Sequence, residues 1–124
     1  MPRIRIRWPA GDATATLNET PTVAKLMQAL PYSNRANVWG DEVYFSLPFS
    51  AEAESTATAV VPTGSVCFWL DGNAIALLFG PTPVSQAGEC RLISAANPMG
   101  MLDQDPDCLR SIRAGDCVTL ERDE

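Results

Sequence analysis

Three residues of the segment 33–39 have the types and the spacing of a ligand-binding face. Arg35, Asn37 and Trp39 stand at alternate positions, so in an extended strand they share one side. Arg35 is the one cation that the spacing places beside an aromatic block, which makes it the candidate catalytic residue. In the alternative interpretation, the aliphatic stem of Arg35 lies over Trp39 while its guanidinium stays in water.

Two further aromatic side chains are predicted to leave the core. Tyr44 has the opposite parity to Phe45, so it faces outward when Phe45 faces inward. Phe68 and Trp69 are adjacent, so one of them must also leave the interior. Trp69 beside Tyr44 would make an aromatic pocket wall. Alternatively, Trp69 packs beneath the small and polar segment 48–58.

The segment 80–85 (GPTPVS) leaves an apolar run through two prolines, which fix φ and stiffen the chain. Thr82, Pro83 and Ser85 are therefore predicted to form the rim of a ligand site. The alternative is a rigid strand exit whose hydroxyls bond to the backbone of their own loop. Asn97, directly before Pro98, is predicted first as a turn residue and second as a pocket amide.

Several kinds of site are not expected. The sequence has no histidine and no CxxC pair among its four cysteines, so no metal site is predicted. Catalytic triads and histidine general bases lack their usual proton carrier. Asp41 and Glu42 are adjacent on a predicted turn, so their carboxylates should point apart into solvent, and no paired acid–base site is predicted. No cofactor is predicted either.

Bulk composition indicates one globular domain, residues 1–124, with 46% hydrophobic and 19% charged residues. The net charge of −6 argues against a nucleic-acid partner or an anionic membrane surface. The longest apolar run, 74–79, is too short to span a bilayer, and the cysteine usage favours a cytoplasmic protein with reduced thiols. The expected partner is a small molecule or a short peptide, and the oligomeric state is left open.

The candidate residues must be positioned mainly by strands, because most apolar residues alternate with polar ones. Arg3, Arg5 and Arg7 are expected on the outer face of an end strand. One main helix is predicted at 21–30 and a minor helical turn at 106–112. The predicted strands are 3–8, 13–17, 33–39, 42–47, 66–70, 74–79, 90–96, 99–102 and 117–121.

The segment 67–79 is predicted to be a hairpin whose turn is Asp71-Gly72, with the glycine at positive φ. Both parities of 74–79 are apolar, which indicates a strand covered on both faces. Strands of this number and spacing are typical of a mostly β protein built as a closed antiparallel barrel.

Three blocks, NVWGDEVYFSLP at 37–48, GSVCFWLDGNAIALLFGPTPVS at 64–85 and SAANPMG at 94–100, occur in this order. In this combination the chain resembles a small cyclophilin-like family of bacterial and archaeal proteins, and the resemblance extends over almost the whole length. It implies a closed antiparallel β-barrel with one helix against an end, as in the cyclophilin prolyl isomerases.

The resemblance leaves two functions open. Cyclophilins carry a His-Arg-rich strand followed by Gln-Gly-Gly, and this chain has neither. The first interpretation is therefore a binding protein of uncharacterised role, with an aromatic surface groove for a small molecule or a short peptide. The alternative is a divergent peptidyl-prolyl isomerase in which Arg35 polarises the prolyl amide.

Overall fold

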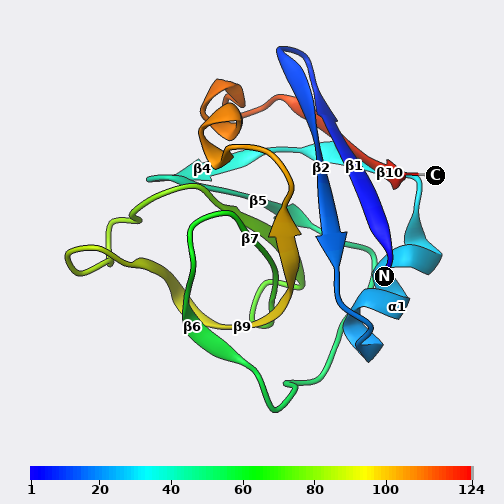
Figure 1. The fold of residues 1–124 in the computed structure, drawn as a ribbon, viewed down its shortest axis with the longest axis horizontal. Helices are drawn as coiled ribbons and strands as arrows, with labels where there is room; N and C mark the ends of the chain where they lie inside the picture. Colours follow the sequence, from blue (N-terminus) through cyan, green and yellow to red (C-terminus); the bar gives the residue numbers. More distant parts are fainter. Residues whose placement is uncertain (124) are drawn as a thin grey trace.

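The computed structural model describes residues 1–123 (Figure 1). Alternating apolar residues place most of this chain in one ten-stranded antiparallel sheet. Two helical segments accompany it, α1 (Pro21–Ala29) and the 3-10 helix η1 (Pro106–Ser111). The strands are β1 (Arg3–Trp8), β2 (Gly11–Leu17), β3 (Tyr32–Arg35), β4 (Asn37–Trp39), β5 (Glu42–Ser46), β6 (Thr58–Val61), β7 (Ser65–Trp69), β8 (Ala74–Leu78), β9 (Cys90–Leu102) and β10 (Cys117–Arg122).

The sheet curls strongly but is not a closed barrel. Its strands follow the order β3-β10-β1-β2-β9-β7-β8-β5-β4, with β6 paired to β9 off this path. The two terminal strands, β3 and β4, are separated only by Ala36, and no ladder joins the ends of the sheet within residues 1–123. Side-chain bonds span the gap instead, because Tyr32 Oη and Asn34 Nδ2 both donate to the carbonyl of Ser46 on β5, at 2.9 and 3.1 Å. The closed barrel predicted from the sequence is therefore not supported.

The alternating arginines lie on β1, which is an interior strand between β10 and β2 and not the expected end strand. Ile4 and Ile6 face the core, and the three arginines face outward toward carboxylates on the flanking segments. The ion pairs are Arg3 with Asp103 and Asp123, Arg5 with Asp12 and Asp123, and Arg7 with Glu121. Each of the three arginines of β1 therefore forms an ion pair with at least one acidic side chain.

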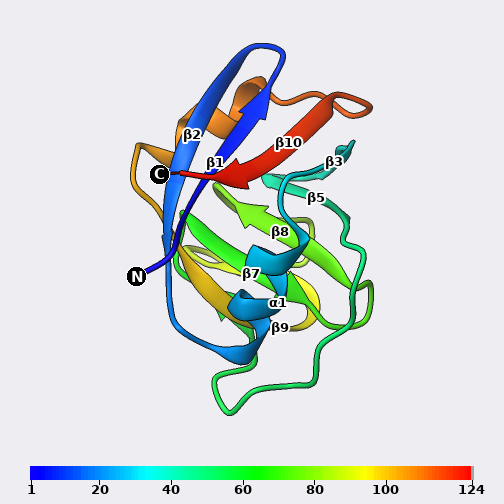
Figure 2. The same ribbon diagram turned by 90° about the vertical axis from the view of Figure 1, so that its right-hand side faces the viewer.

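The helix α1 agrees with its prediction to within one residue. The hydroxyl of Thr20 caps it by accepting from the amide of Val23 at 3.4 Å, and Pro21 opens its first turn. Val23 and Leu26 are its buried core contacts, and Figure 2 shows the helix lying beside β9. Neither helical segment between residues 1 and 123 has the length and apolar character needed to cross a membrane.

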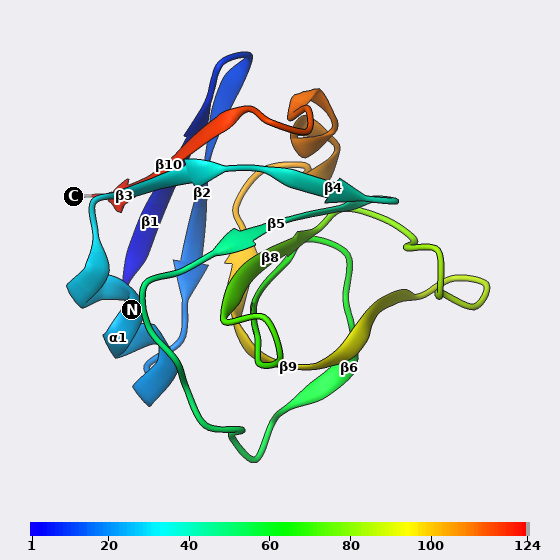
Figure 3. The same cartoon turned by 180° about the vertical axis from the view of Figure 1, so that it is seen from behind.

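The strands β7 and β8 are buried on both faces, as the apolar parities of 74–79 predict. One face of this pair, which includes Phe68 and Ile75, belongs to the main core. The opposite face carries Cys67 and Leu78 into a second, smaller cluster with residues of β6 and β9. Figures 1 and 3 show the first half of β9 sweeping away from β2 toward β6, which covers this second face.

Two turn predictions are wrong in their details. Asn97-Pro98 is not a turn but part of β9, which runs unbroken from Cys90 to Leu102 with a register shift opposite Val66 and Cys67. In the β7–β8 turn the positive φ belongs to Asn73, at 46°, and not to Gly72. A Cβ on Gly72 would lie 2.2 Å from Cζ3 of Trp69, so glycine is needed there because the indole occupies that space.

Candidate functional site

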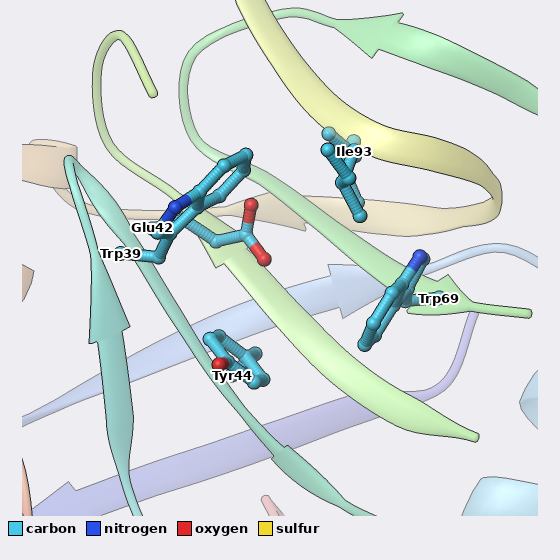
Figure 4. Close-up of a pocket in the computed structure, with 6 residues that line it drawn as sticks. Trp39, Glu42, Tyr44, Trp69 and Ile93 are labelled. Atoms are coloured by element: carbon cyan, nitrogen blue, oxygen red, sulfur yellow. The ribbon is translucent and has the colours of Figure 1, made fainter. Parts of the chain in front are cut away.

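An outward-facing pocket of about 280 Å³, called the aromatic pocket from here on, lies between β5 and the first half of β9 (Figure 4). Four strands contribute to it. Its lining residues are Trp39 from β4, Glu42 and Tyr44 from β5, Trp69 from β7, and Leu92 and Ile93 from β9.

Strand register brings these side chains together. Glu42 and Tyr44 are two residues apart on β5 and therefore face the same side of the sheet. Trp39 is directly opposite Glu42 in the β4–β5 ladder, so it joins that face. On the other side of β5, Glu42 is opposite Leu78 of β8, whose side chain belongs to the second cluster. The floor of the aromatic pocket is thus the outer, apolar face of the sheet.

The indole of Trp69 is held in a defined orientation. It meets the ring of Tyr44 edge to face, with the ring centroids 6.1 Å apart and an interplanar angle of 77°. Its Nε1 donates to Ser94 Oγ at 2.7 Å, and that hydroxyl donates to Asp71 Oδ2 at 2.5 Å. With Gly72 leaving room for the ring, these contacts fix the wall of the pocket that Trp69 forms.

Of the residues that the structure describes, Glu42 alone lines the aromatic pocket with an acidic group. The residue is 4% exposed, and within the described chain its Oε1 has no hydrogen-bond partner. Figure 4 shows the carboxyl pointing into the space between Trp39 and Trp69. Burial raises the pKa of Glu42 to about 7, so the group changes charge near neutral pH.

The buried thiol of Cys67 lies on the same side of the sheet. Burial, with a smaller contribution from the charge of Glu42, raises the pKa of Cys67 to about 12. The thiol therefore stays neutral at physiological pH and adds no charge to the floor of the aromatic pocket.

The prediction that Glu42 is solvated is wrong. Glu42 is the first residue of β5 and not a turn residue, so its side chain takes the parity of Tyr44 and turns toward the covered face. The apolar parities of 74–79 indicate a covered outer face, but only the structure shows that the strand of Glu42 pairs with this segment and shares its cover. Leu92 and Ile93, which were also missed, lie in a predicted strand whose partner the sequence does not reveal.

The structure brings three of the predicted residues together, Trp39, Tyr44 and Trp69. Arg35 and Asn37 are exposed and do not line the aromatic pocket. Arg35 Nη1 donates to the carbonyl of Gly115 at 2.9 Å, and Asn37 Nδ2 donates to the carbonyl of Tyr44 at 3.3 Å. The chain changes ladder partners between Arg35 and Asn37, which separates Arg35 from the aromatic face.

Thr82, Pro83 and Ser85 also lie outside the aromatic pocket. Thr82 is buried, and its hydroxyl donates to the carbonyl of Arg91. Ser85 Oγ accepts from the amides of Thr82 and Arg91, at 2.9 and 3.0 Å. Both hydroxyls thus bond to local backbone.

Pro83 packs against the turn that carries Trp39 and Glu42. A Cβ on Gly40, whose φ is +59°, would lie 2.8 Å from Cδ of Pro83. The amide of Asp41 also donates to the carbonyl of Pro81 at 3.0 Å. The loop 80–85 therefore supports the β4–β5 turn through direct contacts.

Asn97 is fully buried and holds a different part of the molecule. Its Nδ2 donates to Thr22 Oγ1 at 3.0 Å and to the carbonyl of Glu52 at 2.9 Å. Its Oδ1 accepts from the amide of Glu54 at 2.9 Å. Asn97 thus ties β9 to α1 and to the segment 52–54. Residues 1–123 contain no group of histidine, cysteine or acidic residues arranged to hold a metal ion.

Comparison with known proteins gives a family and a fold. A family model described as Cyclophilin-like matches residues 2–121. The solution structure of the hypothetical protein AF2241 from Archaeoglobus fulgidus is 36% identical with a TM-score of 0.84, covering 98% of this chain and 95% of that one. McbB, solved in complex with tryptophan, is 21% identical with a TM-score of 0.67, covering 96% of this chain and 44% of McbB. No curated protein matches the chain.

Proposed function

Because the chain belongs to the cyclophilin-like family, we propose that it is a binding protein of the family's fold that takes a small molecule into the aromatic pocket. One observation carries the proposal. Trp39, Tyr44 and Trp69 come from three different strands and converge on a single pocket of about 280 Å³.

The composition of the aromatic pocket supports a ligand site. Ligand sites are mostly apolar and aromatic, with few polar groups that fix the orientation of the ligand. Here Leu92 and Ile93 extend the aromatic walls, and Glu42 is the single charged group among the described lining residues. Ile93 is 60% exposed, so its apolar side chain is available to a ligand in the aromatic pocket.

The size of the aromatic pocket favours a small molecule over a short peptide. Its volume of about 280 Å³ lies just below the roughly 300–1,000 Å³ of drug-sized ligand sites. McbB shares the fold and was solved with tryptophan, so small aromatic compounds are the first ligands to try.

The alternative proposal, prolyl isomerisation with Arg35 as the polarising donor, has less support. The guanidinium of Arg35 is bonded to the carbonyl of Gly115 and does not line the aromatic pocket. Exchange NMR on a proline peptide, with Arg35→Ala beside the wild type, tests it. Acceleration by the wild type that Arg35→Ala removes would revive this alternative.

We further propose that residues 1–124 act as one domain in the cytoplasm, without nucleic acid. The four cysteines are free, as is usual for a reducing compartment. The outward arginines of β1 are paired with carboxylates, so this row offers little unpaired positive charge to phosphates.

Indole N–H signals in NMR spectra of the ¹⁵N-labelled protein test the binding proposal, because the chain has three tryptophans. Mixtures of small aromatic compounds that are cationic, neutral and anionic are added in turn. We expect the signals of Trp39 and Trp69 to shift. Trp8 serves as the internal reference, since it is buried and its Nε1 donates to Ser111 at 2.8 Å, outside the aromatic pocket.

Two variants make the result specific. Trp69→Leu should abolish the shift of Trp39, whereas Tyr32→Phe, an aromatic change outside the aromatic pocket, should preserve it. If no class of compound moves either pocket indole, or if Trp69→Leu leaves binding intact, the proposal is wrong.

A further inference from the structure

The aromatic pocket combines three electron-rich rings with one buried acid that lacks a hydrogen-bond donor. From this combination we propose that its natural occupant is a small protonated primary or secondary amine, held by the carboxylate of Glu42 and by the faces of the rings. The inference rests on the proposed binding function and specifies the class of ligand.

The state of Glu42 is the first argument. A buried carboxyl oxygen without a donor is costly, so a donor from a bound molecule is one explanation of such a group. Oε1 of Glu42 has no partner within residues 1–123, although the residue is only 4% exposed. An ammonium N–H in the aromatic pocket would supply the missing donor and the opposite charge.

The ring faces are the second argument. The faces of tryptophan and tyrosine carry negative electrostatic potential and attract cations within about 6 Å of the ring centroid. Trp39, Tyr44 and Trp69 surround the carboxyl of Glu42, and Figure 4 shows it in the space between the two indoles. A cation next to this carboxylate would therefore also meet aromatic faces.

Among residues 1–123, no protein cation occupies that place. None of the six lining residues is basic. The neighbouring strands contribute uncharged side chains to the second cluster beneath the pocket, among them the neutral thiol of Cys67 on β7, Leu78 on β8 and Leu92 on β9. Beside Leu92, Arg91 is engaged with Glu89, its Nε donating at 2.7 Å.

The other titratable groups near the aromatic pocket include the phenol of Tyr44, the thiol of Cys90 in the second cluster, and the carboxylate of Asp71, which lies behind Ser94 and Trp69. None of them supplies a positive charge. The net charge of the chain, −6, adds a long-range preference for cations.

The need for an N–H donor decides between classes of cation. A quaternary ammonium would satisfy the rings but would leave Oε1 of Glu42 without a donor, whereas a primary or secondary ammonium satisfies both. Leu92 and Ile93 would contact an apolar or aromatic group on the same molecule. An anionic ligand would face an uncompensated carboxylate.

Three probes of similar shape and different charge test the inference: 2-phenylethylamine, 2-phenylethanol and phenylacetate. Their affinities are measured from the indole N–H signals of Trp39 and Trp69 at about pH 8, where Glu42 is ionised. We expect the amine to bind about 10- to 100-fold more tightly than the alcohol, the range that a charge-assisted hydrogen bond gives. Phenylacetate should bind more weakly than the alcohol.

Glu42→Gln should abolish the preference for the amine while the alcohol still binds. Glu19→Gln, which removes an equal charge from an exposed position outside the aromatic pocket, should leave the preference unchanged. A second measurement needs no variant. Amine binding should release a proton from the wild type at about pH 7, seen as a calorimetric enthalpy that depends on the ionisation enthalpy of the buffer.

The outcomes separate the two proposals. If the alcohol binds as tightly as the amine, or if Glu42→Gln keeps the preference, the amine inference is overturned while the binding function stands. If none of the three probes moves a pocket indole, the amine inference is overturned. Failure of neutral and anionic mixtures as well would then remove the binding function.

Discussion

Trp39 and Glu42 are directly opposed in the β4–β5 ladder, so an indole and a carboxyl stand side by side on one face of the sheet. The same face of β7 and β8 is apolar and is covered by the first half of β9. A carboxyl in this position loses water without gaining a partner. Within residues 1–123, the aromatic pocket therefore contains one carboxyl group that is buried and whose Oε1 has no hydrogen-bond donor.

Stability should depend on pH through Glu42. The folded protein holds the proton of Glu42 up to about pH 7, whereas the unfolded chain releases it near pH 4.5. Between these values the folded state binds more protons, so its stability falls as pH rises, and above about pH 7 the penalty is complete. The difference between the two pKa values corresponds to about 3 kcal/mol.

Glu42→Gln removes this titration. We expect the variant to gain stability relative to wild type as pH rises from about 4 to about 8, by up to about 3 kcal/mol in urea unfolding. Glu19→Gln, at an exposed site, should show no such trend. A stability difference between Glu42→Gln and wild type that is the same at both pH values would contradict the burial of an ionisable Glu42.

Gly72→Ala should displace the indole of Trp69. The added Cβ would lie 2.2 Å from Cζ3 of that ring, so the ring must move and its bond to Ser94 must weaken. We expect a loss of about 1–3 kcal/mol in unfolding free energy and a shifted Trp69 indole signal.

Gly11→Ala is the matched control, since its Cβ would meet the ring of Trp8 at 3.4 Å, an ordinary contact. It should leave the Trp8 signal and the stability nearly unchanged. Equal effects of the two substitutions would mean that Gly72 is not kept free for the indole.

Asn97→Ala should destabilise the fold without altering the aromatic pocket. The change deletes the three hydrogen bonds of the buried Asn97 side chain, which join β9 to α1 and to the segment 52–54. We expect a loss of about 1–3 kcal/mol, because the partners are left without donors or acceptors. Asn37→Ala, at an exposed position, should stay within about 0.5 kcal/mol of wild type. A pocket ligand that binds Asn97→Ala less tightly than wild type would mean that Asn97 belongs to the site.

Local patterns were sufficient for most of the helices and strands and for part of the site. Alternation places Tyr44 outward and Phe45 inward, and the same rule requires that Phe68 or Trp69 leave the core, because side-chain direction in a strand depends only on neighbouring residues. The helix α1 follows from Thr20, Pro21 and the stop at Pro31 in the same local way.

Features that depend on distant strands were missed. Asn97-Pro98 has the composition of a turn, yet pairing of β9 with both β6 and β7 keeps the segment extended, with Pro98 beside a register shift. Glu42 is buried because the first half of β9 covers its face, and no local pattern near Glu42 reveals that partner. Closure of the sheet likewise depends on whether its two end strands, β3 and β4, pair with each other. Only one residue, Ala36, separates these strands along the chain.

The most direct test is a titration of the wild-type protein with 2-phenylethylamine, followed through its three indole N–H signals at about pH 5 and about pH 8, on either side of the pKa of Glu42. We expect the signals of Trp39 and Trp69 to move together, that of Trp8 to stay in place, and the affinity to be at least about tenfold higher at the higher pH. Pocket indoles that do not respond, or an affinity that is equal at the two pH values, would contradict an amine site built on Glu42.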